Sequence, residues 1–229
     1  MKHELKAKFF GVFYGILDVV IPGICANCGK EVKGPKLLCV HCAKSVIIRK
    51  APTKLGNRFL FAATDYKDPA VQNLIKTMKY DRVWKAGKFL SEMMLKHLDL
   101  SGFTALIPKE KEAFIVPIPM HFIKRWKRGF NQSEILAANI GRELRIPVIK
   151  ALKRDKWTPP QSNLKDDSLR SLNIKDCFSL SGKARKIPRG SVIIILDDVV
   201  TSGETMKEAA RIMRPLHPSQ IIFVSVASR

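Results

Sequence analysis

Two adjacent carboxylates and a group of small hydroxyl residues follow a strongly apolar segment late in the chain. The carboxylates are Asp197 and Asp198, and the sequence Thr-Ser-Gly-Glu-Thr occupies positions 201–205. Backbone N–H groups in such a loop at the start of a helix bind phosphate, whereas carboxylates accept hydrogen bonds from sugar hydroxyls. The residue types therefore predict a site for a phosphorylated ribose, with the carboxylates on the ribose and the loop on its 5′-phosphate.

The elements that must position these groups are a strand, a tight loop and a helix. Five large apolar residues at 192–196 show no polar alternation, which predicts a strand buried on both faces of a parallel sheet, and the carboxylates are expected to end it. From Glu204 onward, apolar residues recur at helical spacing at Met206, Ala209, Ala210 and Met213. The alternative without a ligand is a buried strand, a solvated Asp-Asp turn and a helix capped at Ser202.

This segment resembles the phosphoribosyl pyrophosphate signature of type I phosphoribosyltransferases, in which two acidic residues and a Thr-Thr-Gly-x-Thr-like loop follow a hydrophobic strand. The resemblance implies binding of phosphoribosyl pyrophosphate together with Mg²⁺, an ion that keeps several waters and needs few protein ligands. The residues implied are Asp197, Asp198, Val199, Val200, Thr201, Ser202, Gly203, Glu204 and Thr205.

Two Cys-x-x-Cys pairs near the N-terminus predict a metal site. Cys25 and Cys28 form the first pair, and Cys39 and Cys42 form the second. Four thiolates close the tetrahedral coordination of Zn²⁺ and leave no open position for catalysis, so a structural zinc site is expected. Disulfides, a redox pair and a ligand from His41 are the alternatives. The fifth cysteine, Cys177, is expected to be a small buried hydrophobe.

A basic segment containing a tryptophan follows a second short apolar strand, predicted at 114–119. Basic side chains after a strand end can hold pyrophosphate, and Trp126 among them can stack on a base. The alternative is a solvated basic loop with a packed tryptophan. The candidate nucleic-acid-binding residues are Lys124, Arg125, Trp126, Lys127 and Arg128, and a helix is expected to begin within the sequence Arg-Gly-Phe-Asn-Gln at 128–132.

The chain has a large surplus of positive charge. Its 229 residues contain 41 Lys and Arg against 20 Asp and Glu, a formal net charge of +21, which favours an anionic partner such as nucleic acid over a membrane surface. A basic proteome or a solvated surface is the alternative explanation of this charge. The apolar segment 9–21 contains Asp18 and is too short to span a bilayer. It is interpreted as a docking helix, with no membrane span and a cytoplasmic location.

The remaining pattern predicts an α/β protein with a small N-terminal module. Residues 1–52 are expected to form an N-terminal helix and the zinc module, and residues 53–229 the main domain. Within that domain we expect a linker at 52–57, a strand at 58–66, a helix that begins at Pro69, a second helix that continues through Leu98, a long loop at 156–176 and a last strand at 221–226.

Further motifs resemble the ComF family of competence-associated phosphoribosyltransferase-like proteins. The family combines a four-cysteine knuckle, a Lys-Tyr phrase, a Val-Pro-hydrophobic-Pro strand leading to Arg-Gly-Phe-Asn-Gln, a mobile polar segment and the Asp-Asp loop. This chain has them in that order, over nearly its whole length, at Cys25 to Cys42, Lys79-Tyr80, Val116 to Pro119, Arg128 to Gln132, Gln161 with Arg170 and Asn173, and Asp197 to Thr205.

The resemblance implies a type I phosphoribosyltransferase fold, a mainly parallel sheet flanked by helices, and two functional hypotheses. In the first, the protein is an enzyme in which Asp197 and Asp198 orient the ribose and Arg128 or Arg170 stabilises the departing pyrophosphate. In the second, it binds single-stranded DNA during DNA uptake and recombination, with competence or recombination proteins as partners. A metabolic amidophosphoribosyltransferase-like protein that acts on a nucleobase or an amine without any DNA role is the further alternative.

Overall fold

The computed structural model describes residues 23–34, 36–80, 83–155 and 176–229, and its centre is a five-stranded sheet. The strands lie in the order β3-β4-β9-β8-β5, and all neighbours are parallel except the β3-β4 hairpin. Their bounds are β3 (Thr53–Leu55), β4 (Arg58–Asp65), β5 (Ala113–Pro117), β8 (Val192–Val200) and β9 (Gln220–Ser228). The expected mainly parallel sheet is confirmed, with β8 flanked by a parallel strand on each side.

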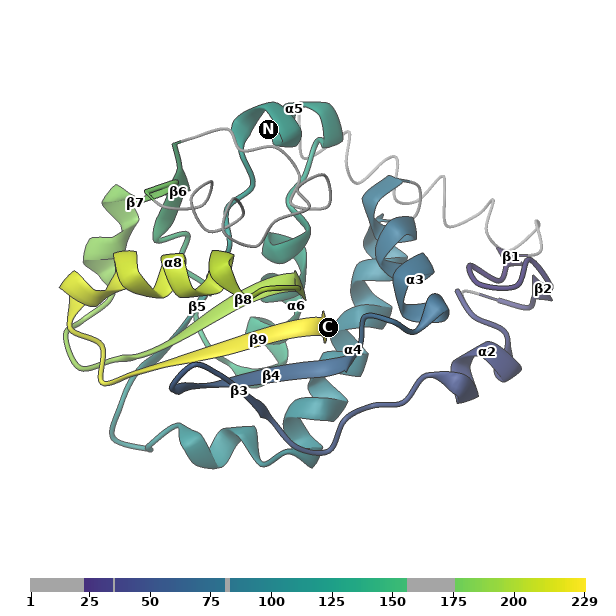
Figure 1. Ribbon diagram of the computed structural model, residues 1–229, viewed down its shortest axis with the longest axis horizontal. Coiled ribbons are helices and arrows are strands. Elements are labelled where there is room, and N and C mark those ends of the chain that lie inside the picture. The colour runs from purple at the N-terminus through teal and green to yellow at the C-terminus, as the bar shows by residue number, and fades with distance from the viewer. Residues whose placement is uncertain (1–22, 35, 81–82, 156–175) are drawn as a thin grey trace.

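Helices cover both faces of this sheet, as the ribbon in Figure 1 shows. One face packs against α3 (Pro69–Tyr80), α4 (Val83–Leu100) and α6 (Gln132–Leu144). The other packs against α8 (Glu204–Met213) and the hairpin of β6 (Leu152–Arg154) and β7 (Phe178–Leu180). The remaining elements are β1 (Gly23–Ile24), β2 (Glu31–Val32), α2 (Val40–Ser45), α5 (Phe122–Arg128) and the 3₁₀ helices η1 (Phe103–Leu106), η3 (Gly182–Lys186) and η4 (Arg214–Leu216).

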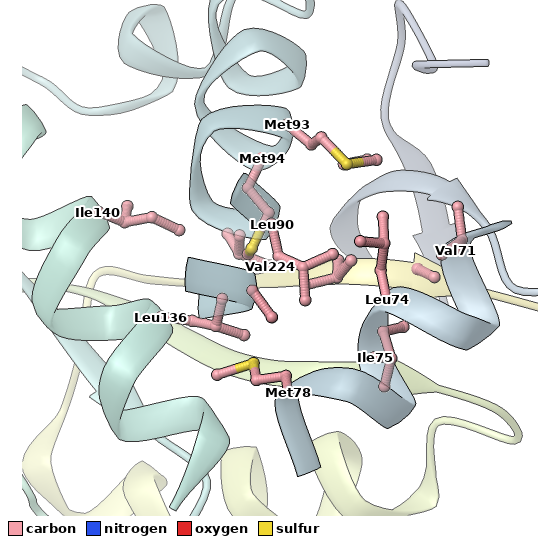
Figure 2. Close-up of a cluster of buried hydrophobic side chains, with 14 of the residues drawn as sticks. Val71, Leu74, Ile75, Met78, Leu90, Met93, Met94, Leu136, Ile140 and Val224 are labelled. Atoms are coloured by element: carbon pink, nitrogen blue, oxygen red, sulfur yellow. The ribbon is translucent and has the colours of Figure 1, made fainter. Parts of the chain in front are cut away.

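The larger core lies between the sheet and the helices α3, α4 and α6. Their side chains meet over Val224 of β9 in Figure 2. Burying side chains of this size contributes roughly 1.5–3 kcal/mol each, so this layer supplies much of the stability of the sheet. The labelled contributors are Val71, Leu74, Ile75 and Met78 from α3, Leu90, Met93 and Met94 from α4, and Leu136 and Ile140 from α6.

The four-cysteine segment is continuous with this core. Cys25, Val32 and Cys42 belong to the same buried cluster as the residues of α3 and α4, and the Asn73 side chain on α3 donates a hydrogen bond to Asn27. In Figure 1 the elements β1, β2 and α2 lie at one end of the molecule, nearest α3. The expected N-terminal docking helix lies outside the described residues, and the domain division after residue 52 stays a prediction.

Two local expectations were wrong. The segment expected to be a linker contains β3, because its register with β4 pairs Thr53 with Leu60 and Leu55 with Arg58. Strand β8 does not end at the carboxylates but continues to Val200, because β9 pairs with it along its whole length. No helix or strand was predicted for the segment directly after β5, and it forms the short helix α5, which is capped by Gly129 with φ of 78°.

The backbone at Ile146 lies close to Gly141 of α6. A Cβ atom added to Gly141 would lie 2.7 Å from both Ile146 O and Val148 Cγ2, and the Ile146 N–H already donates to Gly141 O. We expect Gly141→Ala to lower the free energy of unfolding by about 1–3 kcal/mol, despite the better helix propensity of alanine. Urea denaturation measures this change. Gly182→Ala is the control because its Cβ would enter open space, and an equal loss in both variants would contradict the packing argument.

Candidate functional site

The two predicted carboxylates lie at the carboxyl end of β8, with their oxygens held by hydrogen bonds. Ser133 Oγ donates to Asp197 Oδ1 at 2.8 Å, and the N–H of Asp198 donates to the same oxygen at 2.9 Å. The N–H of Val199 donates to Asp198 Oδ1 at 2.9 Å. Because ligands of open parallel sheets bind beyond the carboxyl ends of the strands, this is where a small-molecule site is expected.

The segment Arg-Gly-Phe-Asn-Gln fixes the start of α6 against the sheet. Asn131 caps α6, since its Oδ1 accepts from the N–H of Ser133 at 3.2 Å, and its Nδ2 donates to Ile118 O just beyond β5 at 2.9 Å. Ser133 therefore reaches Asp197 from a helix start that is anchored on the neighbouring strand. We did not predict Ser133 as a site residue, because serine one position inside a helix has many ordinary roles.

The environment of Asp197 favours its protonated form. Burial of the carboxyl group, together with the negative charge of Asp198, raises the pKa of Asp197 to about 8, although the hydrogen bond from Ser133 opposes the shift. A cation or several hydroxyl donors at this position would favour the charged form. Binding of a cation or of sugar hydroxyls to the carboxylate pair would therefore be coupled to loss of a proton.

The loop 201–203 connects the carboxylates to α8. Gly203 precedes the helix with φ of 78°, and a Cβ atom there would lie 2.5 Å from Leu55 Cδ1 of β3, so glycine is required for two reasons. Ser202 Oγ is buried and has no hydrogen-bond partner among the described residues. An unpartnered buried hydroxyl beside a helix N-terminus suits an anion that accepts hydrogen bonds.

The basic segment places its aromatic residue in solvent and its first arginine in an ion pair. Trp126 is 84% exposed on α5, and Phe122 one turn earlier is 69% exposed. Arg125 donates two hydrogen bonds to Glu134, with N–O distances of 2.8 and 3.3 Å. The Arg128 guanidinium is 3.4 Å from Gln132 Oε1, on the α6 start.

Some predicted residues lie outside the described part of the chain. They are Gln161, Arg170 and Asn173, and the side chains of Lys124 and Lys127. The expected long loop at 156–176 also falls there, except for its last residue, Asp176. Their roles stay predictions.

The four predicted cysteines meet in one cluster. Their Sγ atoms all lie within 4.8 Å of one another, and Cys28 Sγ is 3.7 Å from Cys39 Sγ. A tetrahedral Zn²⁺ with Zn–S distances of about 2.3 Å places its sulfurs about 3.8 Å apart, so the cluster has the size that the ion requires. His41 is not among the clustered ligands, and Cys177 is fully buried elsewhere, as predicted.

The thiols of this cluster favour a bound cation electrostatically. Burial opposes ionisation of Cys25, but backbone N–H groups of Cys28 and Cys39 outweigh it and lower the pKa of Cys25 to about 6. Asn27 donates to Cys42, yet burial and the neighbouring thiols raise the pKa of Cys42 to about 12. Four thiolates at these distances repel one another, so a divalent cation between them would stabilise the fully ionised set.

Comparison with known proteins shows which family the chain belongs to. Residues 110–229 match the phosphoribosyl transferase domain. Competence protein F of Haemophilus influenzae is 27% identical over 216 residues, which cover 90% of this chain and 91% of that protein. The chain belongs to the ComF family. The family's phosphoribosyl transferase domain contains β5, α6, β8, α8 and β9, and therefore the whole Asp197–Ser133 network.

Two further relatives of this ComF protein extend the comparison. The DNA utilization protein YhgH of Escherichia coli K12 is 30% identical over 203 residues, covering 83% of this chain and 84% of that protein. Competence protein ComFC of Bacillus subtilis 168 is 32% identical over 113 residues, covering 49% and 43% of the two chains. In the described part of the ComF chain, no helix has both the length and the apolar character needed to cross a bilayer.

The raised pKa of Asp197 predicts a pH-dependent stability. A carboxyl group whose pKa is higher in the folded state stabilises the fold while it is protonated, and this contribution is lost as the pH rises from about 4 to about 8. We expect Asp197→Asn to raise Tm by roughly 3 °C or more at pH 8.5, with a gain that shrinks towards pH 4. Thermal unfolding without ligand between pH 4 and 9 measures this. Asp99→Asn, an exposed site, is the control, and a pH-independent difference for Asp197→Asn would contradict the assignment.

Proposed function

We propose that this ComF protein binds phosphoribosyl pyrophosphate with Mg²⁺ at the carboxyl end of β8 and uses that site in the handling of single-stranded DNA. The observation that carries the first part is the placement of two hydrogen-bonded carboxylates directly before a loop with an unpartnered buried hydroxyl at the start of α8. Carboxylates for a ribose and N–H groups for its phosphate are thus adjacent on one edge of the sheet.

Each group of this chain has a defined part in binding the ligand. Asp197 and Asp198 accept hydrogen bonds from the ribose hydroxyls, and Ser133 holds Asp197 in the orientation that this requires. Ser202 Oγ and the first N–H groups of α8 hold the 5′-phosphate. Arg128, at the end of α5, lies just before the start of α6 and neutralises the pyrophosphate, and Arg170 is the other candidate for this role.

The carboxylate pair also fits a bound Mg²⁺. This ion prefers oxygen ligands and commonly takes one or two carboxylates together with substrate oxygens and water, which matches two adjacent carboxylates rather than a closed protein cage. Bound there, Mg²⁺ would neutralise charge that develops on the pyrophosphate. Transfer of the phosphoribosyl unit to an acceptor, with pyrophosphate as the leaving group, is the reaction that these residues would support.

A role with single-stranded DNA is supported by the relatives' names, by charge and by α5. The similar proteins are named for competence and for DNA utilization. The formal net charge of +21 provides the attraction that nucleic acid binding needs. Residues 1–50 and residues 51–229 each have more basic than acidic side chains. The exposed rings of Phe122 and Trp126 lie one helical turn apart beside cationic residues, as in base-stacking surfaces.

We further propose that the four-cysteine cluster binds one structural Zn²⁺. Its sulfurs are at the spacing of a tetrahedral site, and Cys25 and Cys42 are part of the core shared with α3 and α4. The metal would therefore stabilise the main fold as well as residues 1–52, and residues 53–229 would form the phosphoribosyltransferase-like domain.

The zinc proposal predicts a metal content of about one per chain that depends on each of the four cysteines. We expect Cys28→Ser and Cys39→Ser to lose most of the bound zinc and to lower Tm by several degrees, since a tetrahedral site that loses one thiolate binds zinc more weakly. Elemental analysis of the purified protein and thermal unfolding measure this. Cys177→Ala removes a thiol without touching the cluster and should keep its zinc. Full metal content in the two serine variants would exclude the cluster as the site.

The ligand proposal predicts Mg²⁺-dependent binding of phosphoribosyl pyrophosphate that the carboxylates control. We expect Asp197→Asn/Asp198→Asn to weaken binding at least roughly tenfold, because each lost charge-assisted hydrogen bond costs about 1.5–3 kcal/mol. Calorimetry measures binding, and pyrophosphate release measures turnover with single-stranded DNA and with a panel of nucleobases. Asp99→Asn is the control for loss of a carboxylate elsewhere.

The outcomes separate the functions that this site supports. Pyrophosphate release that needs one nucleobase, with no DNA binding at physiological salt, would favour the metabolic phosphoribosyltransferase. Binding without release, together with DNA binding that the ligand modulates, would favour a ligand-responsive DNA-binding protein. Unchanged affinity in the double variant would refute the proposed ligand site.

A further inference from the structure

A basic groove lies at the opposite end of the sheet from the carboxylates. It has a volume of about 540 Å³ and is lined at the amino ends of β4 and β9. In the parallel register, Gln220 at the start of β9 is paired with Val192, the first residue of β8. Because β8 has nine residues, the end of the groove at Gln220 is roughly 26 Å from the carboxyl end of this strand, whereas Arg214 at the end of α8 is nearer to it. The polar and cationic lining residues are Asn57, Arg58, Arg214, His217, Ser219 and Gln220.

Two arginines face this groove without a carboxylate partner. Arg58 is half-buried over the ring of Phe223, 5.9 Å from its centroid, and donates to Asn57 Oδ1 at 3.2 Å. Arg214 follows the last residue of α8 and is exposed. Within the described ranges, no Asp or Glu forms an ion pair with either guanidinium. Burial and the charge of Arg214 both lower the pKa of Arg58, as expected of two cations without an anion between them.

Other cations of α8 are neutralised, so the groove differs from the helix beside it. Arg211 pairs with Glu208 and Asp176, and Lys207 pairs with Glu204. The acidic residues at this end of the sheet, Glu110 and Glu112, precede β5, and β8 and β9 separate that strand from β4. The unpaired charge is therefore localised at β4, β9 and the end of α8.

A second basic segment of the chain, at 183–189, ends beside this groove. The N–H of Gly190 donates to His217 O at 2.9 Å, and the N–H of Ser219 donates to Ser191 O at 2.9 Å. His217 has φ of 50°, an uncommon conformation for a residue other than glycine, and these hydrogen bonds hold it in place. These hydrogen bonds place Arg189, which directly precedes Gly190, beside the groove, and the exposed Lys183, Arg185 and Lys186 lie further back along the same segment.

We propose that this groove is a second nucleic-acid contact, in which Arg58, Arg214 and the adjacent basic segment bind backbone phosphates of single-stranded DNA. The inference deepens the proposed DNA function and rests on it. A row of separate cations that extends beyond one groove matches a polymer of phosphates better than a single small anion. Guanidinium groups also bind phosphate oxygens with two parallel hydrogen bonds. The strand would thus contact the protein at both ends of the sheet.

The test compares two variants of the full chain that lose the same charge. Arg58→Gln/Arg214→Gln removes the arginine pair, whereas Lys96→Gln/Arg142→Gln removes two exposed cations from α4 and α6. Fluorescence anisotropy with a labelled oligodeoxythymidylate of roughly 20 nucleotides gives the Kd at several salt concentrations, and this length exceeds the site of one compact domain. We expect the arginine variant to bind about tenfold more weakly, with a slope of log K against log salt smaller by about 1.4, since each lost phosphate contact removes about 0.7.

The control variant is expected to change Kd by less than about twofold, because general attraction without a phosphate contact contributes little to a bound strand. Equal losses in both variants, or no loss in the arginine variant, would overturn the proposal. Thymidine monophosphate that binds the groove as tightly as the oligonucleotide would also overturn it, since the groove would then be a site for small phosphates. Wild-type protein that binds no oligonucleotide would overturn it as well.

Two further measurements separate this inference from the proposed function. Calorimetry with phosphoribosyl pyrophosphate should give the same Kd for the arginine variant and the wild type, and Tm should agree, which shows that the fold and the carboxylate site are intact. Trp126→Ala tests the α5 surface independently. DNA binding that falls with Trp126→Ala but not with the arginine variant would refute the groove and leave the proposed function standing.

Discussion

Strand β8 is buried on both faces as far as Leu196, and the next two residues are carboxylates. Burial of Val192, Ile194 and Leu196 in one core, and of Ile193 and Ile195 in the other, fixes the register of β8 with β5 and β9. A shift of one residue would exchange the two cores, so the position of Asp197 along the sheet is strongly specified. The geometry of the carboxylates depends on this constraint, because it places Asp197 where burial and the charge of Asp198 raise its pKa.

The position of the Asp197 carboxyl group depends on hydrogen bonds that involve three elements, β8, α6 and the end of β5. Ser133 belongs to α6, whose first turn is capped by Asn131, and Asn131 is in turn bonded to the carbonyl of Ile118 beyond β5. The carboxylate is therefore positioned by the anchored helix start and not by its own strand alone. The Arg-Gly-Phe-Asn-Gln motif thus has a structural role in addition to any contact with a ligand. Its asparagine caps α6 and connects this helix to the end of β5.

The sequence was most informative where chemistry and periodicity coincide. The strand, loop and helix at 192–213, the helices α3, α4 and α6 and the four-cysteine cluster are all visible as local patterns, because each is made by residues close together in the chain. The carboxylates were expected to end their strand, but pairing with β9 extends it to Val200. Strand β3 was missed since Pro52 to Asn57 has the composition of a linker, and only its partner β4 shows that it is extended.

Features made by distant segments could not be predicted in this way. Ser133 and Asp197 are 64 positions apart, and Arg58 and Arg214 come from opposite ends of the main domain. A serine or an unpaired arginine carries no signal in the sequence that separates it from the many others on a surface. The ion pairs that neutralise Arg125 and Arg211 are likewise invisible until the fold brings Glu134 and Asp176 beside them.

Helix α8 joins the two sites that we propose to bind phosphate, and its dipole suits both of them. Its ten residues span about 15 Å, with the N-terminus at the loop 201–203 and the C-terminus at Arg214. Aligned peptide dipoles give the N-terminus a partial positive charge, which favours a phosphate, and the C-terminus a partial negative charge, which favours nearby cations. The helix dipole thus stabilises Arg211 and Arg214 at the C-terminus of α8, and the same dipole favours a phosphate at the N-terminus of α8. A single element would therefore support both proposed sites, the first through its backbone N–H groups and the second through side-chain charge beyond its far end.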